Sequence, residues 1–453
     1  MYTRDEVKAI TDKIFNMAKG ADAVEVDLTG SERSGTRWAN STITTNLVQF
    51  DRQLTITVRI GQKTANVSTR DFSDTALQAS VNEAIEDAKG RPDSPNLPEL
   101  LGAQTYVPVD AALPSGVNFG PRERALMVKE SIDICEKKGV LGSGYIPKTY
   151  QTNCTANTKG LFAYYSYAEA GFILTCRMAD GSGSGWAGIT GIKDISMIKA
   201  GDLTDVAADK ALRSRKAKAL EPGRYTVILE PRANARFLSL MTGIFNQGGG
   251  GGGFGGGGGG GGGGFGGGPN QFMRDKKPGD KIFSDLFTLK SDIGNPLLRQ
   301  TPIMGDNTPA AAVTWVEKGI LKNLAGGQNG PRANVNMSLV QEGTELSIAD
   351  MIAQTRRGLL VTFFWYIRGV DNATLLNTGM TRDGLFLIEN GKIVSPVQNF
   401  RWNMSPLVGY NNLTLVGKPV PMHTGESYDG GATALVPAVR IEDFYMTSVS
   451  PAV

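Results

Sequence analysis

The first twenty residues carry apolar side chains at the spacing of a helix. The inward face of this predicted helix comprises Val7, Ile10, Ile14 and Met17. Thr3 and Glu6 have the spacing of a capping box, in which each side chain binds the other residue's backbone N–H, so the helix is expected to begin after Thr3 and to end at Gly20. A second helix is predicted from Ser73 to Gly90, with an inward face of Leu77, Val81, Ile85 and Ala88.

Between these helices the apolar pattern changes to the period of two that is typical of strands. Val24 and Val26 alternate with acidic residues, and a longer alternation covers residues 54–60. A turn at Gly61 leads to a further strand over 64–68. The segment through Gly30 and Gly35 to residues 38–41 is expected to be a loop, because it contains two glycines.

The same order of elements begins again after residue 120. A helix is predicted from Pro121 to Gly139, with an inward face of Ala125, Val128, Ile132 and Cys135. The spacing from helix start to an Ala-Asn-Ser/Thr triplet is the same from Arg4 to Asn40 and from Pro121 to Asn157. Either this match is a coincidence, or residues 1–219 form an α/β domain of two αβ repeats that a helix at 203–219 closes.

Residues 220–223 are rich in turn-forming residues and are the expected boundary to a second domain, 220–453. A strand at 225–229 and a helix at about 233–245 precede a tract of nineteen glycines and two phenylalanines at 248–268. Hairpins are predicted at 316–320 and 387–393, and a helix that Ser347 and Asp350 cap is predicted to run to Gly358. The expected fold class is α+β, with a curved antiparallel sheet dominating the second domain.

The glycine tract at 248–268 is expected to be a flexible loop, since it cannot bury enough surface to offset its chain entropy. It is either a tolerated surface insertion or a segment that lines a peptide passage. The aromatic run at 363–366 leaves two alternatives for its strand. Either the strand is central and buried on both faces, or one face packs in the core while the other meets a partner chain.

Composition narrows the class of function. The 453 residues have a net charge of +3 and no basic run with interleaved aromatics, so nucleic acid is not an expected partner. No apolar stretch reaches the length of a membrane span and the start lacks the apolar core of a signal peptide, so a cytoplasmic location without membrane contact is expected. The cysteines Cys135, Cys154 and Cys176 have no metal-binding spacing and are expected to be buried.

The single histidine, His423, removes most metal and triad chemistry. It follows two prolines and precedes a glycine, and it is expected to lie in a surface loop without a functional role. A hydrolase that works without a metal would need carboxylates or hydroxyls, for which Glu230, Asp306 and Asp383 are the candidates. Their spacing does not pair an acid with a base.

Five blocks, in order along nearly the whole chain, resemble the TldD/PmbA family, whose members TldD and TldE (PmbA) form a cytoplasmic peptidase. These blocks are residues 38–41, 227–231, 281–289, 349–362 and 384–393. In the catalytic members of that family, a helix carries His-Glu-x-x-x-His, whose histidines hold a metal. The equivalent positions here are Ser239, Leu240 and Ile244, and the cysteine ligand that the catalytic members have near the C-terminus is also missing.

The resemblance therefore implies a non-catalytic, TldE-like chain that binds no metal or other cofactor. It implies a heterodimer with a TldD-like catalytic homologue, which would supply zinc, and unfolded peptides as substrates. The alternative is a stand-alone homodimeric protein that binds peptides without hydrolysing them. A partner bearing the metal motif in a neighbouring reading frame would favour the first hypothesis.

Overall fold

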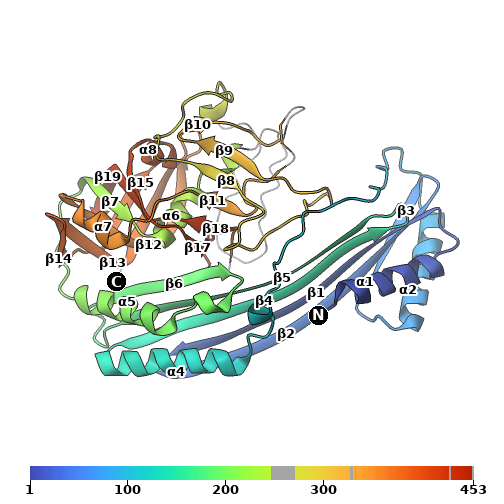
Figure 1. The fold of residues 1–453 in the computed structure, drawn as a ribbon, viewed down its shortest axis with the longest axis horizontal. Coiled ribbons are helices and arrows are strands. Elements are labelled where there is room, and N and C mark those ends of the chain that lie inside the picture. Colours follow the sequence, from blue (N-terminus) through green and yellow to red (C-terminus); the bar gives the residue numbers. More distant parts are fainter. Residues whose placement is uncertain (246–270, 327–329, 332, 428–429, 451–453) are drawn as a thin grey trace.

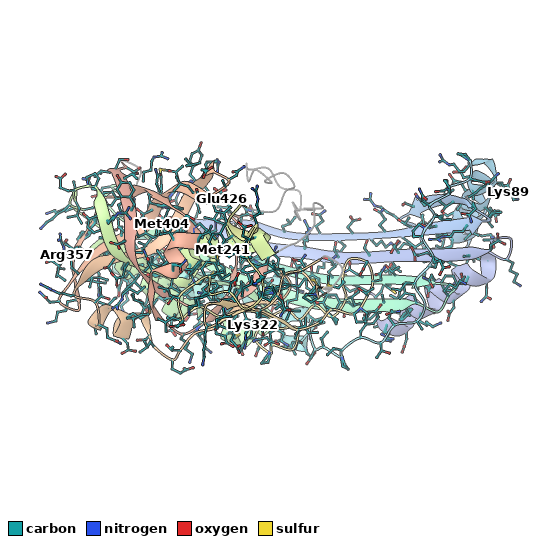
Figure 2. All side chains as sticks on the ribbon, turned by 90° about the horizontal axis from the view of Figure 1, so that it is seen from above. Lys89, Met241, Lys322, Arg357, Met404 and Glu426 are labelled. Atoms are coloured by element: carbon teal, nitrogen blue, oxygen red, sulfur yellow. The ribbon has the colours of Figure 1, made fainter. Side chains whose placement is uncertain are left out.

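The computed structural model describes residues 1–245, 271–326, 330–331, 333–427 and 430–450, so the glycine tract at 248–268 lies outside the described residues. The described chain forms three sheets with helices, and the predicted α+β class is confirmed. Figures 1 and 2 show an elongated molecule in which the first sheet extends well beyond the C-terminal region, toward Lys89. No helix in the described part of the chain is long and apolar enough to span a bilayer.

The first sheet has six strands in the order β3-β2-β1-β4-β5-β6. Its strands are β1 (Ala23–Ala39), β2 (Thr42–Ile60), β3 (Lys63–Thr69), β4 (Leu141–Asn157), β5 (Phe162–Arg177) and β6 (Ser184–Ile192). The helices before residue 220 are α1 (Arg4–Met17), α2 (Asp74–Gly90), α3 (Pro114–Val117), α4 (Pro121–Lys138), the 3₁₀ turn η1 (Ile195–Met197) and α5 (Ala200–Arg213). Strands β1 and β4 pair antiparallel at the centre.

This order confirms the two repeats. Each repeat runs helix, three-stranded meander, helix: α1 to α2 in the first and α4 to α5 in the second. Asn40 and Asn157 both stand where the first strand of a repeat ends and its hairpin begins. The helices α4 and α5 pack on the face of β5 that carries Phe172 and Leu174, whereas Ile173 points to the opposite face and joins the core of the C-terminal region. The C-terminal region therefore packs on the face of the second repeat that lies opposite α4 and α5 (Figure 1).

Local capping chemistry places the helix starts. The capping box of Thr3 and Glu6 is present, Ser73 caps α2, and Gly139 ends α4 in the left-handed conformation. The predicted closing helix at 203–219 is shorter and begins earlier, as α5. The two predicted hairpins and the one predicted capped helix of the C-terminal region also form, although the helix after Ser347 ends at Ala353 rather than Gly358.

Two expectations about the N-terminal region were wrong in detail. The predicted loop through Gly30 and Gly35 is part of the continuous strand β1. Gly35 serves close packing, because a Cβ there would come within 2.5 Å of the Tyr145 ring on β4. In α4 the fully buried stripe includes Arg124 and Ser131, in place of Ala125 and Ile132, which are only partly buried. Apolar periodicity missed this stripe because half of it is polar.

The C-terminal region holds two further sheets. One has the order β10-β9-β8-β11-β18-β17, and its strands are β8 (Leu289–Ser291), β9 (Val313–Glu317), β10 (Ile320–Leu321), β11 (Leu339–Gln341), β17 (Val420–His423) and β18 (Thr433–Val436). The other comprises β7 (Gly223–Leu229), β12 (Arg357–Asp371), β13 (Leu376–Glu389), β14 (Lys392–Pro396), β15 (Phe400–Met404), β16 (Leu413–Val416) and β19 (Val439–Val449). Its path curves back on itself, because β12 pairs with both β7 and β13.

The strand ladders of this region are mostly antiparallel, as predicted, with parallel pairs between β7 and β12 and between β11 and β18. Its helices are short. They are α6 (Pro231–Ser239), the 3₁₀ turns η2 (Thr242–Phe245) and η3 (Gln271–Met273), α7 (Ile348–Ala353) and α8 (Pro406–Asn411). Strands of the first sheet end by Ile192 and those of the other two sheets begin at Gly223, while the domain boundary at 219/220 stays a prediction.

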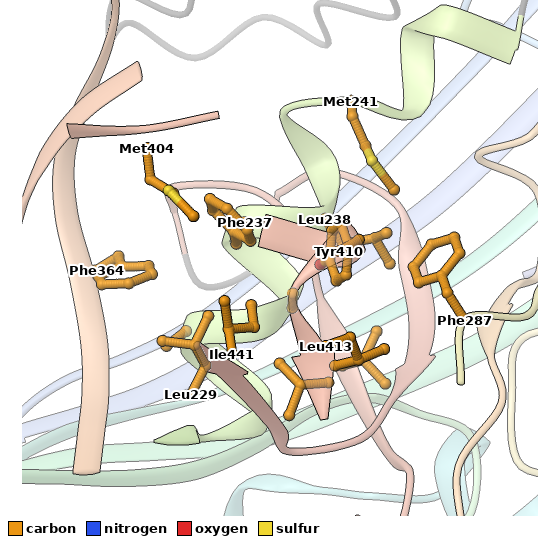
Figure 3. Close-up of a cluster of buried hydrophobic side chains, with 14 of the residues drawn as sticks. Leu229, Phe237, Leu238, Met241, Phe287, Phe364, Met404, Tyr410, Leu413 and Ile441 are labelled. Atoms are coloured by element: carbon orange, nitrogen blue, oxygen red, sulfur yellow. The ribbon is translucent and has the colours of Figure 1, made fainter. Parts of the chain in front are cut away.

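The largest core lies inside the C-terminal region and is centred on helix α6 (Figure 3). The Phe237 ring of α6 is 5.5 Å from the Tyr410 ring and 5.6 Å from the Phe444 ring, measured between centroids. Aromatic rings at these separations add to the stabilisation that comes from burial. The core thus fixes α6 between β12, β19 and α8.

The aromatic run at 363–366 on β12 is neither buried on both faces along its whole length nor divided into one core face and one exposed face. Phe363 and Phe364 are buried on opposite faces, whereas Tyr366 is 47% exposed with φ of +53°. The register of β12 against β13 shifts between Trp365 and Arg368, so the alternation breaks there. The strand is therefore buried on both faces only at its first two aromatics.

Candidate functional site

Helix α6 occupies the position where the sequence resemblance implies a metal site. Pro231 is its first residue and Glu230 its N-cap, which fits the preference of proline for the first helical turn. Ser239 ends the helix, and its hydroxyl donates to the carbonyl oxygen of Arg236 at 2.7 Å. Leu240 follows directly, and Ile244 is buried in the core from η2.

These three positions do not fit a catalytic metal. The Ser239 hydroxyl is engaged with the backbone of its own helix, and the side chains of Leu240 and Ile244 have no lone pair to donate. Across the described residues, no group of three His, Cys, Asp or Glu side chains lies in an arrangement that could hold a metal ion. No hydrolytic step through a metal can be derived from this helix.

The three candidate carboxylates have separate surroundings. Glu230 forms an ion pair with Lys210 of α5 at 2.7 Å and accepts a hydrogen bond from Thr362 at 3.3 Å. It therefore ties the second repeat to the C-terminal region. Asp306 is exposed in a loop, where it accepts from the backbone and hydroxyl of Thr308. Asp383 is buried in β13 at the wall of a small pocket.

His423 is not the surface-loop residue that the sequence predicted. It ends strand β17, is 5% exposed, and lies with its Nε2 3.5 Å from Oε1 of Glu169 on β5. Its backbone N–H donates to the Thr190 hydroxyl at 2.7 Å. Pro419 precedes this short strand and Gly425 follows it, whereas Pro421 lies within it. The burial of His423 comes from β5 and β6, which are distant in sequence.

A largely buried polar cluster surrounds Glu169 where the first sheet meets β17 and β18. Arg299 lies 3.4 Å from Oε2 of Glu169, and the Thr433 hydroxyl donates to the same oxygen at 3.4 Å. Burial alone would raise the pKa of Glu169, but Arg299, His423 and Thr433 outweigh it and lower this pKa to about 2. The cluster joins the two regions through an ionised carboxylate.

Two arginines of α6 hold the turn that follows His423. Arg232 donates to the carbonyl oxygens of His423 at 2.6 Å and of Gly425 at 2.9 Å, and Arg236 donates to that of Thr424 at 2.9 Å. Both side chains are buried, one helical turn apart on the same face of α6. Neither arginine was predicted as a functional residue from the sequence, although two arginines four residues apart in a mostly apolar helix were the available signal.

A pocket of about 240 Å³ lies between the end of β5 and strands β12 and β13. It is lined by Thr175, Arg177, Phe363, Trp365, Arg382 and Asp383. The Arg382 guanidinium lies over the Trp365 ring, 5.4 Å from its centroid. A second, more apolar depression of about 500 Å³ lies beside α8 and is lined by Phe272, Ala373, Thr374, Ser405, Leu407, Val408 and Asn411. Only the smaller pocket has charged groups in its wall.

Sequence comparison assigns the chain to a family. The pattern described as the PmbA/TldA metallopeptidase C-terminal domain matches residues 269–448, and the pattern for domain 1 of the same metallopeptidase matches residues 24–89. Together they span more than half of the chain. The chain belongs to the PmbA/TldD family. No curated protein matches the chain in sequence.

Solved structures of this family's fold cover nearly all of the chain. TldE from Thermococcus kodakarensis is 15% identical, with a TM-score of 0.77 over 97% of this chain and 100% of that one. A candidate modulator of a DNA gyrase from Thermotoga maritima is also 15% identical, with a TM-score of 0.74 over 97% and 99%. A second candidate gyrase modulator, from Bacteroides thetaiotaomicron, gives 15% and 0.74 over 99% and 100%. At this identity the likeness establishes the fold.

Proposed function

We propose that this PmbA/TldD family member is a non-catalytic, TldE-like subunit of a cytoplasmic metallopeptidase complex that processes unfolded peptides. A TldD-like homologue supplies the zinc site. The observation that carries the proposal is helix α6, which keeps its place in the core through Phe237 but presents Ser239, Leu240 and Ile244 where a metal would need ligands. This chain keeps the family's fold but lacks ligands for a metal. The simplest explanation is that another chain needs the shape of this one for its own activity.

The surface that best suits a partner chain is the outer edge of β2. Residues 42–53 of this strand are all exposed, and β3 pairs with β2 only from Leu54 to Ile60. The edge carries four exposed apolar side chains: Ile43, Leu47, Val48 and Phe50, the last 69% exposed. Unprotected edge strands with apolar side chains are sites for strand addition, and a homologous chain can offer an equivalent edge. The partner subunit therefore docks along residues 42–53.

The mass of the native complex tests the partner. Co-expression with a TldD-like homologue is expected to give a stable assembly of both chains, with an interface above about 1,000 Å². The double variant L47E/F50E should abolish co-elution, while V206E, which alters an equally exposed valine on α5, should leave it intact. If the two wild-type chains elute separately at micromolar concentration, the subunit proposal fails. Self-association of this chain alone would favour the homodimeric peptide-binding alternative.

The activity of the complex tests the role. The assembly should cleave flexible peptides and spare folded proteins, and a chelator should abolish cleavage. Elemental analysis should assign the zinc to the homologue, with none bound stoichiometrically by this chain. A homologue that is equally active alone would contradict the proposal, because the present chain would then contribute nothing to catalysis.

A further inference from the structure

The small pocket between β5, β12 and β13 has an unusual wall. Oδ1 of Asp383 and Nε of Arg382 are both buried, and within the described structure neither has a hydrogen-bond partner. Buried polar atoms are normally paired, since leaving one unpaired forfeits its hydration without replacement. One is an acceptor and the other a donor, and they belong to adjacent residues of one strand. A group that offers both a donor and an acceptor would satisfy the two atoms together.

The local backbone holds these groups in place. Asp383 has φ of +52° and is followed by Gly384 with φ of +125°, so the strand departs from regular geometry at this point. Nε of Arg382 lies 3.6 Å from Oδ2 of the Asp383 carboxylate, and the nearby Ser184 side chain of β6 favours the ionised form of this carboxylate. Burial raises the pKa of Asp383, while Arg382, Ser184 and Arg177 act in the opposite direction. The Asp383 carboxyl therefore lies close to polar or charged side chains of β5, β6 and β13.

The charges of the wall favour a negatively charged guest. Arg177 and Arg382 both line the pocket, against the single carboxyl of Asp383. Guanidinium groups bind carboxylates through paired N–H donors. The ring of Trp365 and the buried Phe363 supply an apolar surface beside them. A ligand with a carboxylate, an adjacent N–H donor and a small side chain matches all of these features.

We propose that this pocket binds the carboxylate end of an amino-acyl group: the carboxylate meets Arg177 and Arg382, the adjoining N–H donates to Asp383, and the side chain lies against Trp365. The C-terminal residue of a peptide and a free N-acylated amino acid share this chemistry. The inference rests on the proposed peptide-handling function for its choice of a peptide end. Arg232 of α6 lies over the ring of Phe363, 5.3 Å from its centroid, so the pocket adjoins the helix that corresponds to the catalytic one in the family.

Binding measurements on the purified full chain test the pocket without any partner. Calorimetric titration with acetyl-Ala-Ala-Ala should show at least about tenfold tighter binding than the same peptide with a C-terminal amide. That preference should fall below about threefold in R382Q and in R177Q. Both arginines reach solvent, so these variants are expected to fold, which their melting temperatures would verify. The matched control R122Q, an exposed arginine of α4, should keep the wild-type preference.

Two further ligands test the contact with Asp383 and distinguish a peptide end from a free N-acyl amino acid. Methylation of the last amide nitrogen of acetyl-Ala-Ala-Ala should weaken binding to the wild-type chain, and this loss should shrink in D383N, which keeps a residue type that tolerates positive φ. N-acetylalanine that binds as tightly as the peptide would assign the pocket to free N-acyl amino acids and keep its chemistry. Equal binding of acid and amide peptides, or no binding of either at millimolar concentration, would overturn the proposal.

The result of the peptide-binding experiment does not depend on whether the chain assembles with a TldD-like homologue. A chain that fails to join a TldD-like homologue but prefers the acid peptide would contradict the proposed function and support the pocket. If the complex forms and cleaves peptides equally well with the R382Q and the wild-type chain, and neither chain prefers the acid peptide to the amide, the proposed function is supported and the pocket proposal is contradicted.

Discussion

Gly144 on β4 lies directly opposite Trp38 on β1, and the indole occupies the space that a side chain at position 144 would need. A Cβ added there would come within 2.3 Å of the Trp38 ring and 2.5 Å of the Ile173 carbonyl oxygen. Trp38 is 2% exposed and belongs to the core beneath α4 and α5. The join between the two repeats is therefore packed around one ring that requires a glycine beside it.

The variant G144A should be destabilised by about 3 kcal/mol, the upper part of the range for overpacking a core, because neither the ring nor the backbone carbonyl can move freely. Urea unfolding followed by circular dichroism would measure the loss. Gly305→Ala is the matched control, since a Cβ there meets no atom within 4 Å. Equal stability of the two variants would show that Trp38 repacks without cost.

Arg124 makes a second testable contribution to the same region. Its guanidinium donates to Thr36 at 3.1 Å, to the Phe119 carbonyl oxygen at 3.1 Å and to Asn46 at 3.2 Å, while the side chain is 1% exposed. Arg124→Met should lower the free energy of unfolding by about 2 kcal/mol, since it removes the guanidinium donor from the buried Thr36 hydroxyl and the buried Phe119 carbonyl oxygen. R122Q on the same helix should change it by less than about 0.5 kcal/mol. Thermal unfolding of both variants at one pH is sufficient to compare them.

The Glu169 cluster gives the chain an acid-sensitive contribution to stability. The native pKa of Glu169 is about 2, below the ordinary value of about 4.5, so its stabilising effect is complete above pH 4.5 and is lost as the pH falls through 2. E169Q should be less stable than the wild type by about 3 kcal/mol at pH 7, because Arg299 loses its largely buried ion-pair partner.

The difference between E169Q and the wild type should narrow as the pH falls from about 4.5 toward 2. Chemical unfolding at pH 7, 4 and 3 would follow it. Glu345→Gln, on an exposed residue, serves as the control and should show almost no difference at any of these values. A gap that stays constant with pH would mean that the pKa of Glu169 is the same in the folded and the unfolded chain.

Restoring the metal motif should not restore activity. The triple variant S239H/L240E/I244H places an imidazole at Ile244, which is 6% exposed and packed in the largest core, so a lower melting temperature is expected together with no peptidase activity. Assays with and without added zinc would measure both. Zinc-dependent cleavage by the variant alone would show that the remaining ligands of a metal site are present.

The three cysteines should be unreactive in the folded chain. All three are buried and so shielded from a reagent, and burial also raises the pKa of the Cys154 thiol to about 12, which leaves almost no thiolate of that residue at neutral pH. A thiol reagent such as Ellman's reagent should modify none of them within minutes at pH 8 and all three after unfolding in urea. Rapid modification of the native chain would indicate an opening of the first sheet.

The parts of the fold that the sequence predicted depend on local interactions. Thr3 with Glu6, and Ser347 with Asp350, start helices through contacts three residues apart, and Asn390-Gly391 adopts the positive φ values that its hairpin requires. The errors depend on partners distant in sequence. Gly35 reads as a loop residue until Tyr145 is placed over it.

The same distinction applies to the candidate site. The replacement of metal ligands at Ser239 and Ile244 is visible in the sequence, because it needs only the identity of the residues. The burial of His423 depends on Glu169 and Thr190, which lie in another sheet, and the unpaired Oδ1 of Asp383 depends on the strands around it. Neither could be inferred before the sheets were positioned.

The central pairing of β1 with β4 also has a consequence for how the chain folds. The hairpins inside each repeat join strands that are neighbours in sequence, whereas the pairing of Trp38 with Gly144 must close a long loop. Each meander is therefore expected to form early, and the two halves to join in the rate-limiting step. Substitutions at this junction should then slow refolding. Substitutions inside a hairpin should also slow refolding rather than speed unfolding, because the hairpin is already formed at the barrier.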